Sequence, residues 1–251
     1  MRFRARAAIR RAAIKGVALL LPAMMTAACG EGLFRQYEYE EDVYLSLDGS
    51  ATVYVNTSIQ ALNALRGTSF DPSPGALFDR PGFARFFGSP AAHVVWVRSS
   101  RRSGRRFVHV RLEVDDVNRL GATAPFAWST YRFGREGELF VYRQAVGRSS
   151  GGAADAGWNG RELVAFRLHL PSKIVYHNTL PDNLRRGNIL VWEQPLADRL
   201  RGVPVALDAR METQSILNRT LALFGATLVA VAVTFGLVIL WVTRRTEPSS
   251  P

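Results

Sequence analysis

Only one cysteine, Cys29, is present in the 251 residues of the chain. A disulfide needs two cysteines and a cysteine-based zinc site needs several, so neither can form within a single chain. The four histidines lie far apart in the sequence, without a His-x-x-x-His or His-Glu-x-x-His spacing. The sequence therefore predicts no metal site and no cofactor.

Clusters of residues that could catalyse a reaction are also scarce. Glu38, Glu40 and Asp42 lie on one face of a predicted strand, with successive side chains about 7 Å apart. That spacing favours a solvated edge, or a partner for an arginine-rich surface, over a paired general acid and base. We predict that the protein is not an enzyme and has no catalytic residue. A hydrolase, the least favoured alternative, would need a histidine beside a hydroxyl and a carboxylate in one cleft. The histidines considered for that role are His109, His169 and His177.

The sequence does contain one long apolar run, from Leu221 to Val242, which is closed by Arg244 and Arg245. It has 22 consecutive residues without a charge, and 13 of them are Leu, Ile, Val or Phe. A helix of that length is about 33 Å long, against about 30 Å of hydrocarbon in a bilayer. A buried helix of a soluble protein is rarely so long or so uniformly apolar. We therefore predict a transmembrane helix over 221–242.

The N-terminus has the pattern of an export signal. Residues 1–15 are basic, and the apolar stretch from Gly16 to Ala28 is too short to span a bilayer. It ends in Thr26-Ala27-Ala28-Cys29, which resembles the lipobox of bacterial lipoproteins, although Thr26 stands where leucine is usual. The resemblance implies that 1–28 is a cleaved signal peptide and that Cys29 is lipidated. The alternative is an ordinary signal peptide with a chance cysteine, and the export route, Sec or twin-arginine, stays open.

These two ends together predict how the chain sits in the cytoplasmic membrane. The signal places residues 29–219 on the extracytoplasmic side, as one domain held at both ends to the membrane. One pass over 221–242 then leaves the tail, 243–251, in the cytoplasm, where Arg244 and Arg245 satisfy the positive-inside rule.

The net charge of +11 is concentrated at the N-terminus. Six basic residues lie in 1–28, whereas the segment between the signal and the apolar run has 24 basic and 20 acidic side chains, a net charge of +4. That charge does not favour nucleic acid as a partner, but it is compatible with a surface near anionic lipid.

The predicted domain consists of short strands. Apolar and polar side chains alternate over 37–47, Asp48-Gly49 supplies a turn, and the alternation resumes over 51–55, which predicts a hairpin. Ser58 and Gly67 have the positions of an N-cap and a C-cap around a short helix. In all, we predict about eight strands and two or three short helices, an α+β domain with a mostly antiparallel sheet.

Two segments of this domain supply candidate contact residues. The first is rich in proline and phenylalanine, and its rings either cover the core or form an exposed apolar lip. Its candidate ligand contacts are Phe70, Phe78, Phe83, Phe86 and Phe87. The second is a predicted hairpin tip whose arginines suit lipid headgroups or an acidic partner, unless they are simply solvated. Its candidates are Arg101, Arg102, Arg105 and Arg106.

The order of the motifs resembles the LppM-like lipoprotein family of bacteria. The matching pieces are the lipobox, Leu47-Asp48-Gly49-Ser50, the segments from Leu170 to Val175 and from Gly187 to Trp192, and the C-terminal span. The resemblance implies a membrane-tethered domain, and a lipid-binding role has been suggested for the mycobacterial member. We therefore predict a binding module for a lipid-like or apolar ligand at the membrane surface, with membrane lipid as its partner. The alternative is an interaction or envelope assembly protein that contacts another membrane protein.

Overall fold

A computed structural model describes residues 35–151, 157–180 and 187–245 of the chain. The chain divides into two compact units, Met1–Gln36 and Tyr37–Pro251. The predicted signal peptide, Cys29 and the last residues of the predicted tail, 246–251, lie outside the described residues.

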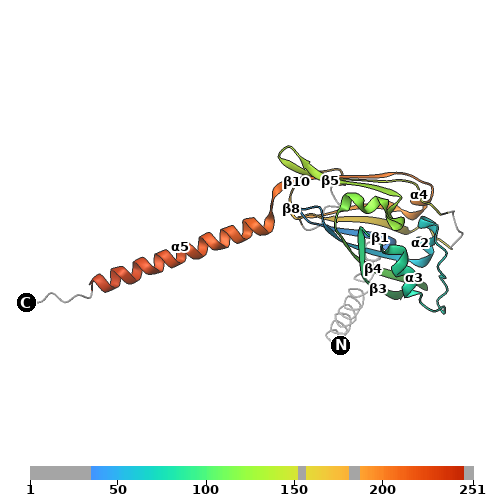
Figure 1. Cartoon of the computed structure of the whole chain (residues 1–251), viewed down its shortest axis with the longest axis horizontal. Helices are drawn as coiled ribbons and strands as arrows, with labels where there is room; N and C mark the ends of the chain where they lie inside the picture. The colour runs from blue at the N-terminus through green and yellow to red at the C-terminus, as the bar shows by residue number, and fades with distance from the viewer. Residues whose placement is uncertain (1–34, 152–156, 181–186, 246–251) are drawn as a thin grey trace, which may run out of the picture. The chain divides into compact units, whose positions relative to one another are not determined.

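Within the described residues, the chain forms ten strands in two sheets (Figure 1). The six-stranded sheet has the order β3-β4-β2-β1-β7-β9. Its strands are β1 (Gln36–Leu45), β2 (Ala51–Ser58), β3 (Ala92–Arg102), β4 (Arg105–Val114), β7 (Glu162–His169) and β9 (Ile189–Pro195). The four-stranded sheet has the order β5-β6-β10-β8. Its strands are β5 (Ser129–Glu136), β6 (Leu139–Val146), β8 (Ser172–His177) and β10 (Val205–Ser215).

Short helices connect the strands, and a long helix follows them. They are α2 (Ile59–Arg66), α3 (Arg80–Phe87), the 3-10 helices η1 (Val117–Ala122) and η2 (Ala124–Phe126), α4 (Leu196–Leu200) and α5 (Ile216–Arg245). The predicted α+β class is confirmed. The structure has more strands than the predicted eight, partly because β8 is a separate strand that pairs with β10 through irregular register.

Local signals explain the start of the fold. Gly49 adopts a φ of +88° in the β1–β2 turn, and Asp48 Oδ1 accepts hydrogen bonds from the N–H and the hydroxyl of Ser50. The Ser58 hydroxyl oxygen accepts from the N–H of Ala61 and caps α2, and Gly67 ends that helix in the left-handed region. The predicted hairpin and helix are therefore confirmed.

The core lies between the two sheets and the short helices. Side chains of β2 and β4, such as Val53, Val110 and Leu112, belong to the same buried cluster as Leu207 and Met211 of β10. Each fully buried aliphatic side chain contributes about 1.5–3 kcal/mol relative to exposure. This cluster supplies the main driving force for folding of the body.

The predicted solvated acidic edge is wrong. β1 lies between β2 and β7 in the middle of its sheet, and Glu38 is only 1% exposed. Glu40 and Asp42 are partly buried and pair with Arg167 at 2.7 and 3.1 Å. The other half of the expectation, that these carboxylates are partners for arginines, fits the structure.

α5 contains a candidate membrane span, Thr220–Arg244, which is long and apolar enough to cross a bilayer. It covers the predicted segment 221–242, and its apolar side chains, such as Leu228 and Phe235, are exposed in the described part of the chain. Exposure of so many large apolar side chains would be unfavourable in water, so membrane insertion accounts for this helix better than solvent does.

Candidate functional site

The predicted phenylalanine segment forms one aromatic cluster over the core. Phe83 and Phe87 of α3 are each 1% exposed. Phe70 stacks on Phe83 with ring centroids 3.9 Å apart, Phe78 lies 5.2 Å from Phe83, and Phe86 meets Phe87 edge-on at 5.0 Å. The five rings therefore cover the core rather than forming an exposed apolar lip.

This cluster leaves a small, partly open cavity of about 210 Å³. Its apolar lining comes from Ile59, Phe70, Phe78 and Phe83, and Leu77 at its rim is 97% exposed. The polar lining consists of Ser69, Asp71, Asp79 and Arg106. The lining thus combines aromatic and aliphatic side chains with a few polar groups, the kinds of residue that line small-ligand sites.

Helix α3 begins where it does because Asp79 caps it. Asp79 Oδ1 accepts from the N–H of Gly82 at 2.8 Å, and Pro81 occupies the first turn, where its missing N–H costs nothing. The cap fixes the start of the helix that supplies Phe83 to the cavity.

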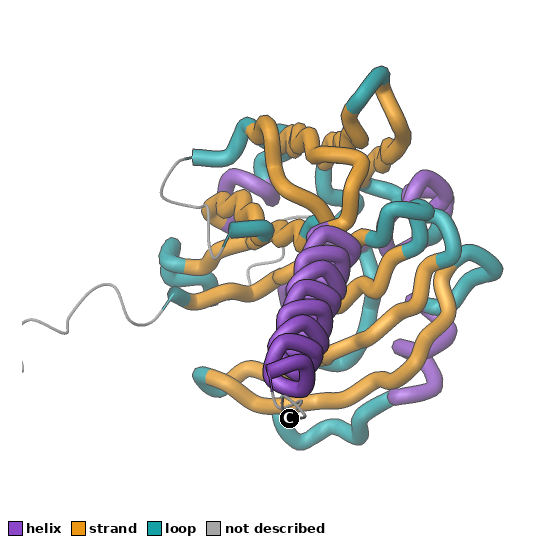
Figure 2. Tube along the Cα trace, turned by 90° about the vertical axis from the view of Figure 1, so that its left-hand side faces the viewer, coloured by secondary structure: helices purple, strands orange, loops and turns teal. Residues whose placement is uncertain are grey.

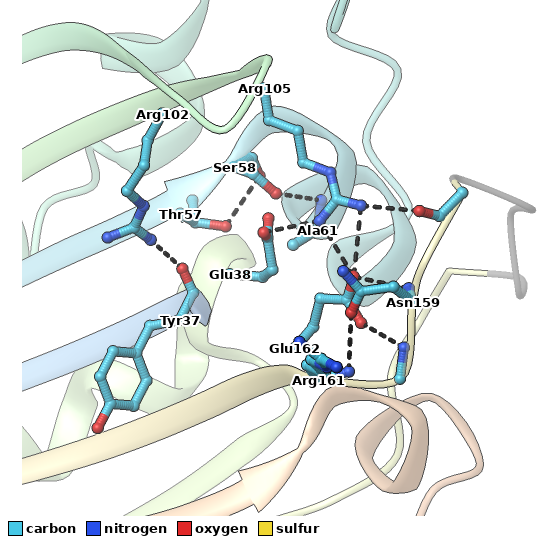
Figure 3. Close-up of polar contacts among 12 residues, drawn as sticks. Tyr37, Glu38, Thr57, Ser58, Ala61, Arg102, Arg105, Asn159, Arg161 and Glu162 are labelled. Atoms are coloured by element: carbon cyan, nitrogen blue, oxygen red, sulfur yellow. Dashed lines mark hydrogen bonds and ion pairs between the residues drawn. The ribbon is translucent and has the colours of Figure 1, made fainter. Parts of the chain in front are cut away.

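Arg105, one of the predicted contact residues, is largely buried and donates hydrogen bonds within the domain (Figure 3). Its guanidinium donates to Glu38 at 2.7 Å, to Glu162 at 3.4 Å and to the carbonyl oxygen of Gly157 at 2.9 Å, and it lies over the Trp158 ring. This arginine joins β4 to β1 and β7.

Glu162 is held by backbone groups as well as by Arg105. The N–H groups of Asn159 and Gly160 each donate to it at 2.9 Å (Figure 3). Burial acts to raise the pKa of Glu162, but these hydrogen bonds and the nearby guanidinium outweigh it, so the pKa is lowered. Glu162 therefore carries its charge at neutral pH.

The other three predicted arginines also donate to acceptors within the chain. Arg101 donates to the carbonyl oxygen of Pro74, Arg102 to that of Tyr37 (Figure 3), and Arg106 to that of Ala76. Arg101 and Arg102 remain exposed, whereas Arg106 is buried beside the cavity. The hairpin is thus less available to an external anion than its charge suggests.

His109 has the neighbours that a catalytic histidine needs, but not their setting. Its Nε2 lies 2.7 Å from Ser100 Oγ and its Nδ1 lies 2.8 Å from Asn56 Oδ1. Burial, with a contribution from Arg102, lowers its pKa, so the ring is neutral at pH 7. The three residues come from neighbouring strands, and Ser100 is exposed on the sheet. The third partner is an amide rather than a carboxylate, and the hydroxyl is not enclosed in a cleft.

The loop after β6 contains a spacing that is typical of hydrolases. Gly147-Arg148-Ser149-Ser150-Gly151 has the Gly-x-Ser-x-Gly spacing of a hydrolase nucleophile turn. In that motif the serine lies between a strand and a helix, whereas residues 147–151 follow β6 as a loop whose Ser150 N–H donates to Leu65 O at 2.9 Å. The pattern is therefore a spacing match without the geometry.

Glu41 is a buried carboxylate between the two sheets. It accepts hydrogen bonds from Tyr39 at 3.1 Å, Tyr131 at 2.8 Å and Gln144 at 2.9 Å. Burial raises its pKa, and those hydrogen bonds, together with Arg66, only partly offset the effect. The alternation along β1 puts Glu41 on the buried face of the strand, but no local pattern indicates the side chains that it meets across the core.

Among the described residues, no group of three or more His, Cys, Asp or Glu side chains is arranged to hold a metal ion.

Comparison with models of protein families gives no match, and comparison with curated proteins gives none. Among solved structures, the chain is similar to the folded domain of LppM from Mycobacterium tuberculosis, determined by NMR. The two chains are 12% identical with a TM-score of 0.42, over 72% of this chain and 94% of that one. At this identity and TM-score the likeness is a distant similarity of fold only.

Proposed function

We propose that the protein is a membrane-anchored, non-catalytic binding domain whose cavity takes one apolar chain of a lipid-like ligand. The observation that carries the proposal is the cavity lined by Ile59, Phe70, Phe78 and Phe83, with Leu77 exposed at its rim. We further propose that the domain is extracytoplasmic, with the C-terminus in the cytoplasm and Cys29 lipidated.

The size of the cavity limits the ligand. Drug-sized ligands occupy pockets of about 300–1,000 Å³, and 210 Å³ corresponds to about seven water molecules. Such a volume suits several methylene groups of one acyl chain rather than a whole lipid. At about 0.8 kcal/mol for each buried methylene, six of them contribute about 5 kcal/mol before the costs of binding.

Binding of dodecanoate to the full chain in detergent-free nanodiscs tests the proposal. Replacing Ser69 with tryptophan fills the cavity rim without removing a core side chain, because Ser69 lines the cavity and is exposed. We expect Ser69→Trp to weaken dodecanoate binding at least tenfold, whereas Ser99→Trp, at an exposed position on β3, leaves it unchanged. Equal binding by both variants, or no binding by the unaltered chain, would contradict the proposal.

Contact with another membrane protein through the arginine hairpin or α5 stays the second hypothesis. Its support is limited to the exposure of Arg101, Arg102 and the apolar face of α5, since Arg105 and Arg106 are buried or partly buried and donate within the domain.

A further inference from the structure

Strand register fixes which segments lie at each end of the body. At one end, Leu45 pairs with Ala51, and Ala51 pairs in turn with Val114. His169, the last residue of β7, stacks on Tyr44 with ring centroids 3.7 Å apart, so the β7–β8 connection lies at this end too. We call it the anchor end.

At the anchor end, β10 runs into α5 without a loop between them (Figure 2). Ser215 pairs with Ser172 of β8, and the N–H of Ile216 donates to the carbonyl oxygen of Pro171 at 3.1 Å. The Ser215 hydroxyl oxygen accepts from the N–H of Leu217 at 3.2 Å. The first turn of α5 is therefore hydrogen-bonded to the end of the four-stranded sheet.

Little chain separates this junction from the candidate span, which begins at Thr220. The five residues after Ser215 rise about 7.5 Å as a helix, close to the thickness of one headgroup layer, about 5–7 Å. A span by α5 therefore brings Ser215 and the neighbouring Lys173 to the headgroups. The side chain of Lys173 is 69% exposed, which suits a polar contact with lipid rather than insertion.

The arginine hairpin and the cavity lie at the opposite end. β4 runs for ten residues from Arg105 to Val114, so the hairpin tip is about 30 Å from the anchor end. Ile59, which lines the cavity, follows directly after β2, whose last residue, Ser58, pairs with Phe107 near the hairpin. Figure 1 shows α2 and α4 at this end of the strands.

We infer that the body stands end-on to the bilayer that α5 spans, with the anchor end on the lipid headgroups and the cavity facing away. The orientation rests on the junction and the strand register, whereas its consequence for the ligand rests on the proposed function of the cavity and deepens it. A cavity about 30 Å from the anchoring headgroups receives its apolar chain from a source other than that bilayer. The arginines of the hairpin are then also out of reach of those headgroups. Contact with the headgroups of this bilayer is therefore not their role.

Headgroup proximity tests the orientation. The full chain, with Cys29→Ser, carries one new cysteine at an exposed position, either Lys173→Cys at the anchor end or Ser103→Cys at the hairpin tip. Each is labelled with a fluorophore in nanodiscs of phosphatidylethanolamine and phosphatidylglycerol that contain a lipid with a nitroxide on its headgroup. We expect quenching at Lys173→Cys several-fold greater than at Ser103→Cys, because only the anchor end rests on the headgroups.

Equal quenching at the two positions, stronger quenching at Ser103→Cys, or no quenching at either would overturn the inference. As a control, eight Gly and Ser residues inserted between Ser215 and Ile216 uncouple the body from α5. We expect this insertion to raise quenching at Ser103→Cys, and an unchanged value would contradict the role of the junction. Dodecanoate binding in the same nanodiscs is a separate readout, so its loss with the orientation intact contradicts only the proposed function.

Discussion

At the scale of single residues, Glu41 shows how the two sheets are joined. Its carboxylate is 1% exposed and is held by two tyrosine hydroxyls and the amide of Gln144. A buried charge is costly even when it is hydrogen-bonded, and here burial raises the pKa of the group. The carboxylate therefore connects β1 to Tyr131 and Gln144 of the other sheet. When it is ionised, its burial lowers the free energy of unfolding.

The effect of Glu41 ionisation on stability can be tested by varying the pH. Because the pKa of Glu41 is higher in the folded than in the unfolded state, its contribution is present at low pH and is lost as pH rises through the folded pKa. We expect the unfolding temperature of the unaltered chain to fall relative to that of Glu41→Gln between about pH 4.5 and neutral pH. Thermal unfolding followed by near-ultraviolet circular dichroism measures it.

Glu113→Gln is the matched control, because Glu113 lies on β4, two strands away from β1, and its side chain is 47% exposed. We expect the difference between Glu41→Gln and the unaltered chain to change more with pH than the difference between Glu113→Gln and the unaltered chain. A constant difference for Glu41→Gln would show that the carboxylate titrates as an ordinary exposed group.

At the scale of elements, Arg105 joins three strands that are distant in sequence. Its partner Glu38 is 67 residues away and Glu162 is 57 residues away. The side chains of Arg105, Glu38 and Glu162 are 12%, 1% and 2% exposed, so the ion pairs are largely shielded from water. Loss of the arginine removes the cation that pairs with both of these largely buried carboxylates.

We therefore expect Arg105→Ala to lower the free energy of unfolding by about 3–5 kcal/mol. Arg101→Ala, in the same hairpin but exposed, should change it by no more than about 0.5 kcal/mol. Denaturant unfolding of both variants in the same micelles measures the difference. Similar small effects for the two would mean that the Arg105 pairs do not hold the strands together.

The elements also show what the sequence can and cannot predict. Helix α2 was predictable because its signals, Ser58 and Gly67, lie at its own ends. The central position of β1 was not, because its neighbours β2 and β7 begin at Ala51 and Glu162, and no local pattern records which strands meet. The phenylalanine cluster followed from composition, whereas its cavity depends on how the rings pack.

At the scale of the whole molecule, the two predicted anchors attach to opposite ends of β1 and its neighbours. Cys29 lies seven residues before Gln36, a reach of at most about 25 Å. Gln36 begins β1, whose ten residues set it about 30 Å from the anchor end. The two lengths are close, and the thioether-linked glycerol of a lipidated cysteine adds to the reach, so acyl chains on Cys29 can still enter the bilayer beside α5. Lipidation of Cys29 is therefore compatible with the end-on orientation.

The central claim, that the domain binds an apolar chain in its phenylalanine-lined cavity, is tested most directly by photo-crosslinking. A fatty acid with a diazirine at its methyl end is bound to the full chain in nanodiscs and irradiated, and the modified peptides are identified by mass spectrometry. The account predicts modification within 69–83, which contains Phe70, Phe78 and Phe83, and its loss in Ser69→Trp. Modification confined to α5, or unchanged in Ser69→Trp, would contradict it.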